Sequence, residues 1–435
     1  MSGPLVLLTQ DGMTKIAKSS VPGGDLHLSL STVDEFYIVT KIEVSNGLVV
    51  PVGPRRQFEA LGWAADEYRG QWLTNVAEEA HLHHLMLATR SDAAMPWESF
   101  RGLLPKAKDP RDGAIPLITH APVLSKEWID AGVKPFAAWL VSRGKVCAIS
   151  LEVEPDESGV WRLDPQWPVA KLQERRVAVV GLGSIGGRVA EALAAYGVGT
   201  IDLIDPDRFM WHNQVRHVLG PESVGRSKVA AMKAILDRRW PDSKIHAHEW
   251  NVVNDAHLLR GLLADVDLVV CAADGIAPRR VVSHLARRAN LPAIQACVLA
   301  DGAIGEVTRY RPGRRYGCLM CHRADLLARG AIDLEADQEL DYGTAVSHKP
   351  MTAVGPDLHL VAQLAAKAAV ATILESLYGD EQHRLPGEHA VVGLRPTAEF
   401  EPPFDTDAAA SISWHDIAPP RGDCATCATC ATCAP

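Results

Sequence analysis

Residues Arg175–Lys228 contain the stretch that decides the fold of this chain, RRVAVVGLGSIGG…GTIDLIDPDRFMWHNQVRH…VGRSK. A buried strand is predicted over Val177–Val180, and it leads into a glycine-rich turn that opens a helix. A second strand, Thr200–Ile204, follows and ends at the Asp-Pro-Asp sequence of residues 205–207. The turn glycines are Gly181, Gly183 and Gly186. This strand–turn–helix–strand order predicts the start of a parallel α/β sheet.

The glycine turn has the composition of a nucleotide-binding loop. Glycines allow the backbone to approach a ligand closely, and the N-terminus of the following helix favours negative charge. Asp205, at the end of the second strand, is well placed to bind ribose hydroxyls. Nicotinamide-dependent dehydrogenases share all of these features, so they predict a nucleotide without deciding the reaction.

Three polar residues downstream favour a different chemistry. Asn213, Arg216 and Lys228 would add an amide and two cations just beyond the nucleotide. Such groups neutralise charge that builds up on a triphosphate during nucleophilic attack, and hydride transfer does not need them. Each of the three taken alone would be read as a solvated surface group.

Asp274 lies three residues after another apolar run, Val266–Cys271. An acid just beyond the end of a buried strand lies at the mouth of the sheet, where it can hold Mg²⁺ against phosphates. The common alternative is that it caps the helix containing Arg279.

The second part of the chain alternates strand and helix patterns, which predicts a Rossmann-like, mostly parallel sheet with helices on both faces. The pattern ends with a strand over Ala303–Tyr310, a polar loop over 325–349 and an apolar helix over Asp357–Tyr378. The predicted strands are Val177–Val180, Thr200–Ile204, Lys244–Glu249, Val266–Cys271 and Ala293–Cys297.

The first part is predicted to be a separate α/β domain. Hairpins are expected around Ser45–Gly47 and Ser142–Lys145. A helix is expected over residues 66–88, where apolar residues recur at helical spacing. A Pro- and Gly-containing acidic stretch, Glu154–Pro168, suggests the boundary. The predicted domains are 1–170, 171–403 and a Cys-rich tail, 404–435.

His81, His83 and His84 form a cluster in the first domain. A metal site would need a third group outside the helix, and none is identifiable. They are interpreted as ordinary surface and core histidines.

The composition limits the broad class of protein. The 435-residue chain is 47% hydrophobic with a formal net charge of -9, which gives no indication of nucleic-acid binding. The first residues do not resemble a signal peptide, and we expect no apolar run long enough to span a bilayer. We therefore expect a cytoplasmic protein without nucleic-acid or membrane partners.

The nine cysteines fall into two groups. Those at 147, 271 and 297 lie singly in apolar runs and are expected to be core residues. Cys318 and Cys321 form a CxxC knuckle, which supplies two thiolates to a tetrahedral zinc that a second CxxC completes. Three tail pairs are available: Cys424/Cys427, Cys427/Cys430 and Cys430/Cys433.

The order GxGxxG, DxD, NxxR, Lys, strand-Asp and CxxC, over residues 171–435, resembles the adenylating superfamily of ThiF, MoeB and the ubiquitin-activating enzymes. The resemblance implies that the C-terminal glycine carboxylate of a ubiquitin-like protein attacks ATP, giving an acyl adenylate and pyrophosphate. It also implies a homodimer, with ATP, Mg²⁺ and a structural Zn²⁺ as cofactors.

The resemblance assigns roles by position. Asp205 corresponds to the ribose-binding acid and Asp207 to the second acid of the pair. Asn213, Arg216 and Lys228 correspond to the phosphate-contacting residues, and Asp274 to the magnesium ligand. The family's second zinc pair lies near the C-terminus, which favours Cys424 and Cys427 as the first pair after the folded region.

Two features depart from the family pattern. Many members receive a phosphate-contacting arginine from a partner or twin domain, and here Arg55 and Arg56 are the candidates. The first domain also lacks a copy of the nucleotide motif, so it is either a degenerate twin or a recognition module.

In ubiquitin-activating enzymes a cysteine attacks the adenylate, forming a thioester that passes to a conjugating enzyme. The expected crossover region, residues 324–350, has no cysteine. Either the reaction stops at the adenylate, or Cys430 or Cys433 is the nucleophile.

Four functions are therefore compared. The favoured one is activation of a ubiquitin-like protein in a bacterial, antiviral conjugation pathway, because the extra first domain exceeds a housekeeping enzyme's needs. The others are adenylation of a sulfur-carrier protein for thiamine or molybdopterin synthesis, a nicotinamide-dependent oxidoreductase, and a non-catalytic scaffold.

Overall fold

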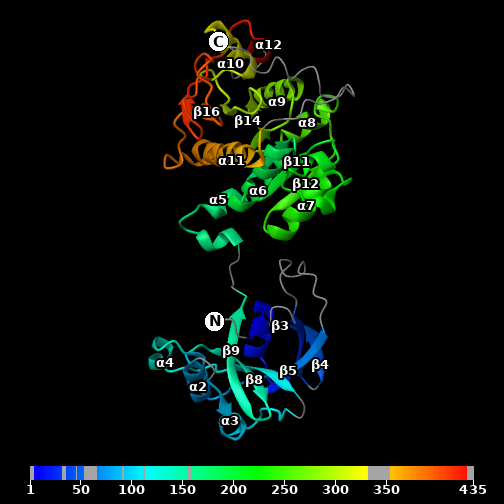
Figure 1. Cartoon of the computed structure of the whole chain (residues 1–435), viewed down its shortest axis with the longest axis vertical. Coiled ribbons are helices and arrows are strands. Elements are labelled where there is room, and N and C mark those ends of the chain that lie inside the picture. Colours follow the sequence, from blue (N-terminus) through cyan, green and yellow to red (C-terminus); the bar gives the residue numbers. More distant parts are fainter. Residues whose placement is uncertain are drawn as a thin grey trace. The chain divides into compact units, whose positions relative to one another are not determined.

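The computed structural model describes residues 4–31, 36–45, 47–52, 66–90, 93–110, 113–154, 159–331 and 353–428. The chain divides into two compact units, Met1–Ser158 and Gly159–Pro435. Each unit has its own sheet (Figure 1). Each unit also has its own hydrophobic core.

The sheet of the first unit closes on itself. Its strands follow the order β1-β3-β2-β5-β7-β8-β9, and β1 also pairs with β9. The strands are β1 Leu5–Leu8, β2 Gly23–Ser31, β3 Phe36–Ser45, β4 Leu48–Pro51, β5 Asp66–Thr74, β6 Met95–Pro96, β7 Ala114–His120, β8 Phe136–Ser142 and β9 Lys145–Val153. The helices are α1 Gln10–Ala17, α2 Glu78–Ala88, α3 Trp97–Leu103 and α4 Lys126–Asp130. Both predicted hairpins, β3–β4 and β8–β9, are confirmed.

The predicted helix over residues 66–88 is wrong in its first half. Residues 66–74 form β5, and the helix α2 begins only at Glu78. Trp72 is fully buried in one core, and the adjacent Leu73 is buried in another. A strand that is buried on both faces lacks the alternation that would distinguish it from a helix.

The second unit contains an eight-stranded sheet in the order β12-β11-β10-β13-β14-β15-β16-β17. The pairs from β12 to β14 are parallel, and the pairs from β14 to β17 are antiparallel. The strands are β10 Arg176–Val180, β11 Thr200–Ile204, β12 Lys244–His248, β13 Leu268–Cys271, β14 Ala293–Leu299, β15 Ile304–Tyr310, β16 His389–Gly393 and β17 Ile412–His415. All six strands predicted in this part are confirmed, and β16 and β17 are additional.

Helices cover both faces of this sheet, as the sequence predicts (Figure 1). Along β10, Val177 and Val179 face a core shared with α6, α7 and α11, whereas Ala178 and Val180 face a core shared with α8, α9 and α10. This alternation follows from the two-residue period of a strand. The helices are α5 Val169–Gln173, α6 Ser184–Tyr196, α7 Lys228–Arg239, α8 Ala256–Leu262, α9 Ile276–Arg288, α10 Leu319–Ala328, α11 Gly355–Tyr378 and α12 Ala425–Ala428. Short 3-10 turns lie at Gly159–Leu163, Trp211–Asn213 and Pro221–Ser223.

Helix α11 corrects the expectation about apolar runs. Its 24 residues are long and apolar enough, by length and composition, to cross a membrane. Its burial explains this composition, because Ala362, Ala365 and Ala369 are fully buried in the core that contains α6. The helix starts with Pro356 in its first turn and ends at Gly379, whose φ of 62° is left-handed.

The segment after residue 403, predicted as a tail, adds structure to the sheet. Strand β17 pairs antiparallel with β16, with Ala390 opposite Trp414. The folded region therefore continues past the predicted boundary and reaches the cysteines at 424 and 427.

Candidate functional site

The carboxyl ends of three parallel strands meet at one edge of the second unit's sheet. Val180 of β10 is level with Ile204 of β11 and with Cys271 of β13. The glycine turn, the acidic pair and Asp274 follow these three strands directly. Ligands of open α/β sheets bind at this edge. The structure thus brings the glycine turn, the acidic pair and Asp274, which the sequence analysis predicts for the nucleotide, to one edge of the sheet.

Two glycines of the turn lie so close to neighbouring backbone atoms that a side chain would not fit there. Gly181 has a φ of +83°, and a Cβ there would lie 2.5 Å from the Cα of Ala273. A Cβ at Gly186 would lie 1.7 Å from the carbonyl oxygen of Gly181. Gly183, by contrast, has no atom within 4 Å of a built Cβ, and it is the N-cap of α6 without a side-chain cap. The turn is therefore packed on its inner side and open at the helix N-terminus, as phosphate binding requires.

The two acids after β11 have different surroundings. Asp205 is 5% exposed, and its carboxylate accepts hydrogen bonds from the backbone N–H groups of Leu182 (2.6 Å) and Asp207 (2.8 Å). Asp207 has a side chain that is 60% exposed. Burial raises the pKa of Asp205, although Lys228 opposes this effect. Asp205 shapes the turn from within, and Asp207 is the acid that faces outward.

Lys228 lies at the centre of the acidic groups. Its Nζ is 2.8 Å from Asp207 Oδ2 and 3.7 Å from Asp205 Oδ1, although the residue is only 7% exposed. Burial disfavours its charge, but Asp205, Asp207 and Asp274 together raise its pKa. The lysine therefore remains a cation at the edge of the sheet and balances the acids there.

Asn213 and Arg216 lie on the segment between β11 and α7. The side chain of Asn213 accepts the N–H of Met210, which fixes the 3-10 turn. Arg216 packs its backbone against Gly355 at the start of α11, 3.4 Å from a built Cβ. Within the described residues its guanidinium has no ion-pair partner, so it is a cation available to a ligand.

Asp274 is exposed in the loop between β13 and α9. The N-cap of α9 is Gly275, so Asp274 does not occupy the capping position considered as an alternative. The neighbouring carbonyl of Ala273 accepts a bond from Nε of Arg279, a residue that is 3% exposed. This buried arginine anchors the loop that carries Asp274.

His217 is a site residue that the sequence analysis missed. Its Nδ1 accepts the N–H of Leu219 at 3.0 Å, so its Nε2 carries the proton and donates to the carbonyl of Leu182 at 2.5 Å. Burial lowers the pKa of His217 to about 4, which keeps the ring neutral. The peptide groups of the glycine turn are thus held from both sides, by Asp205 and His217. The available signal was its position directly after Arg216.

Two pairs of cysteines that are far apart in the sequence lie together in the structure. Cys318 Sγ lies 3.9 Å from Cys321 Sγ and 3.6 Å from Cys424 Sγ, and Cys321 Sγ lies 3.8 Å from Cys427 Sγ. A regular tetrahedron with Zn–S bonds of about 2.3 Å has S–S edges of about 3.8 Å. The four buried thiols therefore fit a zinc ion, and the pair that the sequence analysis favoured is the one present. The alternative pairs require Cys430 or Cys433, which lie outside the described residues, as do Arg55 and Arg56.

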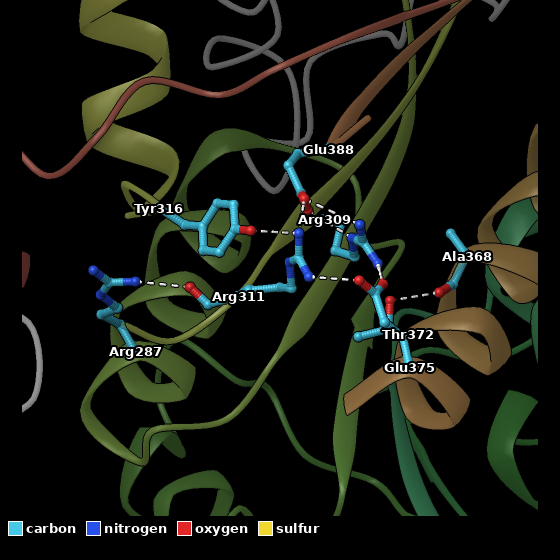
Figure 2. Close-up of polar contacts among 8 residues, drawn as sticks. All are labelled: Arg287, Arg309, Arg311, Tyr316, Ala368, Thr372, Glu375 and Glu388. Atoms are coloured by element: carbon cyan, nitrogen blue, oxygen red, sulfur yellow. Dashed lines mark hydrogen bonds and ion pairs between the residues drawn. The ribbon is translucent and has the colours of Figure 1, made fainter. Parts of the chain in front are cut away.

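A buried ion network, also missed from the sequence, supports the turn that leads to Cys318 (Figure 2). Arg309 donates to Glu388 at 2.6 and 3.0 Å and to Glu375 at 2.6 Å. Arg311 donates to Glu375 at 2.9 Å and to the hydroxyl of Tyr316 at 2.5 Å. Two arginines and two glutamates leave the network without net charge.

The histidines of α2 are structural. His81 is 2% exposed and bonds Lys134 O at 2.7 Å and Thr119 Oγ1 at 2.9 Å. His84 donates to the carbonyl of Ala138 at 2.8 Å, and His83 contacts its own helix at Glu79 O. The interpretation of this cluster as ordinary packed histidines is confirmed for the described residues.

A cavity of about 400 Å³ lies away from the glycine turn. Its lining includes Arg280, Met320, Arg323, Phe404 and Cys424. It therefore borders the cysteine cluster and does not include the predicted nucleotide residues.

Comparison with known proteins identifies the family. The profile of the ThiF family matches residues 161–395, and the chain belongs to this family. Ubiquitin-like modifier-activating enzyme 5 of Drosophila simulans is 29% identical over 161 residues, which cover 35% of this chain and 40% of that protein. The Bombyx mori protein of the same name is 26% identical over 249 residues, covering 55% and 60%. The chain thus matches less than two thirds of the length of these relatives.

Solved structures give a weaker likeness. A crystal structure of E. coli MccB with ATP aligns with a TM-score of 0.43 and 22% identity, covering 61% of this chain and 68% of MccB. A structure of SeMet PaaA aligns with a TM-score of 0.41 and 20% identity over 54% of this chain and 73% of that one.

Proposed function

We propose that this chain activates a ubiquitin-like protein by ATP-dependent adenylation of its C-terminal glycine. The observation that carries the proposal is the group of cations and acids around the glycine turn. Lys228 lies among three carboxylates, and Arg216 lacks an ion-pair partner among the described residues. A nicotinamide enzyme has no use for this arrangement, whereas attack on a triphosphate does.

In the proposed reaction a carboxylate oxygen of the substrate forms a bond to the α-phosphorus of ATP. The bond between the α-phosphorus and the bridging oxygen breaks, and pyrophosphate leaves with that electron pair. Arg216, Lys228 and Asn213 would bind the phosphate oxygens as this charge moves. Asp274, exposed beside Lys228, fits Mg²⁺, which neutralises phosphate charge when bound.

The acidic pair divides between two tasks in this proposal. The ribose-binding role that the family pattern assigns to Asp205 is shared with Asp207, because Asp205 already accepts two backbone hydrogen bonds. Asp207 would receive the ribose hydroxyls once ATP phosphates compete for Lys228. Asp207→Asn should therefore weaken ATP binding without unfolding the turn.

The first test is ATP–pyrophosphate exchange stimulated by the ubiquitin-like protein encoded beside the gene. Arg216→Ala and Lys228→Ala should lower the exchange rate by about a hundredfold or more, as loss of a transition-state charge partner does. ATP binding, measured by calorimetry, should weaken far less. Arg226→Ala, an exposed cation of the same segment, is the matched control. Equal losses of ATP affinity and of turnover would contradict these roles.

The second part of the proposal is thioester formation at Cys430 or Cys433, followed by transfer to a conjugating enzyme in a bacterial antiviral pathway. Its support is that Cys424 and Cys427 suffice for the four-thiol cluster, which leaves two further cysteines. Intact-protein mass spectrometry with MgATP should show an adduct that dithiothreitol removes. The adduct should be absent from the Cys430→Ala/Cys433→Ala protein. Adenylated partner without any adduct would instead favour a sulfur-carrier substrate or another acceptor thiol. A homodimer is proposed from the family alone.

A further inference from the structure

Three buried side chains from separate elements converge beside the cysteine cluster. Glu306 of β15 is 2% exposed, His322 of α10 is 1% exposed and His389 of β16 is fully buried. One potential metal-ligand atom from each lies within 4.8 Å of those of the other two. The rings of His322 and His389 have centroids 4.6 Å apart. This set, Glu306, His322 and His389, is here named the histidine triad.

The nitrogens of the histidine triad are incompletely paired. Neither ring nitrogen of His322 has a hydrogen-bond partner in the part of the chain that the structure describes, and the same holds for Nδ1 of His389. Buried polar atoms are nearly always bonded, and exceptions mark a water or an ion that completes the site. Two orphaned nitrogens on one ring that is 1% exposed are therefore evidence for a missing ligand.

Two imidazoles and a carboxylate are a common protein ligand set for a divalent transition metal. His389 Nε2 is 2.8 Å from Glu306 Oε1, where the two atoms share a proton. A metal replacing that proton would need an N–O separation of about 3.3 Å, the edge of a tetrahedron with bonds of about 2.05 Å. A shift of about half an ångström would create this spacing, and His322 would supply the third ligand.

Cys297 and Arg323 complete the surroundings of the carboxylate, and Cys297 Sγ donates to Glu306 Oε2 at 3.5 Å. Arg323 donates to both oxygens of Glu306, at 2.7 Å to Oε1. A carboxylate offers about four lone-pair positions, so Arg323 and a metal can share it. Arg323 also lines the cavity of about 400 Å³, so it contacts both the carboxylate of the triad and this cavity. Carboxylate ligands are commonly oriented by such outer hydrogen bonds.

We propose that the histidine triad binds a second zinc ion, distinct from an ion in the four-cysteine cluster. Helix α10 would provide one ligand to each, because Cys321 faces Cys427 at 3.8 Å while the adjacent His322 faces His389. The second ion would have two nitrogen ligands, one oxygen ligand and an open fourth position. This site is independent of the proposed adenylation.

The decisive measurement uses the wild-type protein. Metal analysis after zinc loading and desalting should give two zinc ions per chain. X-ray absorption at the zinc edge should show sulfur ligands at about 2.3 Å and nitrogen or oxygen ligands at about 2.0–2.1 Å. Equal amounts of zinc should have the two kinds of ligand. One zinc per chain with sulfur ligands alone would overturn the proposal, whatever the fate of any variant.

Variants then assign the second ion. His322→Gln should lose one zinc and the nitrogen signal while it keeps the sulfur-bound ion. His415→Gln, whose ring lies 6.0 Å from His389 and outside the triad, is the control and should keep both ions. Retention of two zinc ions by a folded His322→Gln protein would assign the second ion elsewhere and reject the triad. Folding of both variants is checked by thermal unfolding.

Discussion

The ring of His217 illustrates how one residue can determine the shape of the glycine turn. Its accepted bond from Leu219 fixes the tautomer, and its donated bond to the carbonyl of Leu182 constrains the turn. Phe209 packs against the ring at a centroid distance of 5.1 Å. Both ring nitrogens of His217 are used in these bonds, so it is a positioning residue. If the proposed adenylation is correct, its effect should appear in ATP binding and turnover.

We predict that His217→Ala lowers kcat/KM for ATP in pyrophosphate exchange by about tenfold, the value of one net hydrogen bond of about 1–1.5 kcal/mol. His217→Gln should recover part of this loss, because its amide can donate near the position of Nε2. Val215→Ala, at a side chain that is 83% exposed, serves as the control. Failure of the Gln variant to recover any activity over the Ala variant would contradict a role for the hydrogen bond to Leu182.

At the scale of residues, the sequence predicted which residues gather at the edge of the sheet better than it predicted where their side chains point. The spacing from Gly181 to Asp274 predicted which residues gather at the edge of the sheet, because parallel strands end at one edge. It could not indicate that Asp205 turns inward and Asp207 outward. That difference depends on two backbone N–H groups whose direction no local pattern encodes.

At the scale of elements, the buried ion network joins β15, α11 and the residue before β16 (Figure 2). Arg309 has a side chain that is 2% exposed and Glu388 one that is 5% exposed. Removing Arg309 leaves one arginine, Arg311, against two glutamates, so one negative charge is uncompensated in a largely buried place, which costs more than the intact pair contributes. The network therefore makes the antiparallel half of the sheet sensitive to single substitutions.

We predict that Arg309→Met lowers the free energy of unfolding by about 3–5 kcal/mol, the usual cost of breaking a buried ion pair. Urea unfolding followed by tryptophan fluorescence measures this. Arg238→Met, at an exposed position of α7, should change stability by no more than about 0.5 kcal/mol. A loss below 1 kcal/mol for Arg309→Met would mean that water enters and solvates the remaining carboxylates.

Strand prediction succeeded where strands alternate with helices and failed at β5. In the second unit the predicted strands are short apolar runs between helical patterns, so length and context distinguish strands from helices. In β5, Trp72 and Leu73 are both buried because the closed sheet has a core inside and helices outside. Burial on both faces removes the two-residue period that sequence analysis depends on.

At the scale of the whole molecule, contacts between residues far apart in the chain could not be predicted from the sequence. The pairing of β1 with β9 brings Leu5 level with Ser150. The cysteine cluster joins residues that are 106 positions apart, Cys318 with Cys424 and Cys321 with Cys427. The CxxC spacing predicted a metal knuckle, but the choice of its partner pair came from family resemblance, since spacing alone left three pairs open.

Buried neutral histidines make the stability of both units depend on pH. Burial lowers the pKa of His81 in the first unit and of His217 in the second to about 4. In the unfolded chain the imidazole pKa is about 6.5, so between about pH 4 and pH 6.5 the unfolded chain binds protons that the folded chain does not bind. The contribution is therefore complete above pH 6.5 and is lost as the pH falls from 6.5 towards 4.

We predict that lowering the pH from 7 to 5 reduces the free energy of unfolding by about 2 kcal/mol for each of these histidines. Urea unfolding at both pH values measures the loss. His217→Gln should reduce the pH dependence of the second unit by that amount, whereas His257→Gln, at an exposed position, should not. An unchanged slope in His217→Gln would show that the ring is protonated in the folded state.

Helix α9 has a consequence beyond covering the sheet. Near its first turn Arg279 holds the carbonyl of Ala273 beside Asp274, and one turn further Ser283 accepts the N–H of Leu319, next to Cys318. Near its other end Arg287 donates to the carbonyls of Arg311 and Gly313. A helix of this length, roughly 20 Å, resists bending and compression. The same rigid helix therefore positions both the loop of Asp274 and the residue that follows Cys318, through side chains only one turn apart.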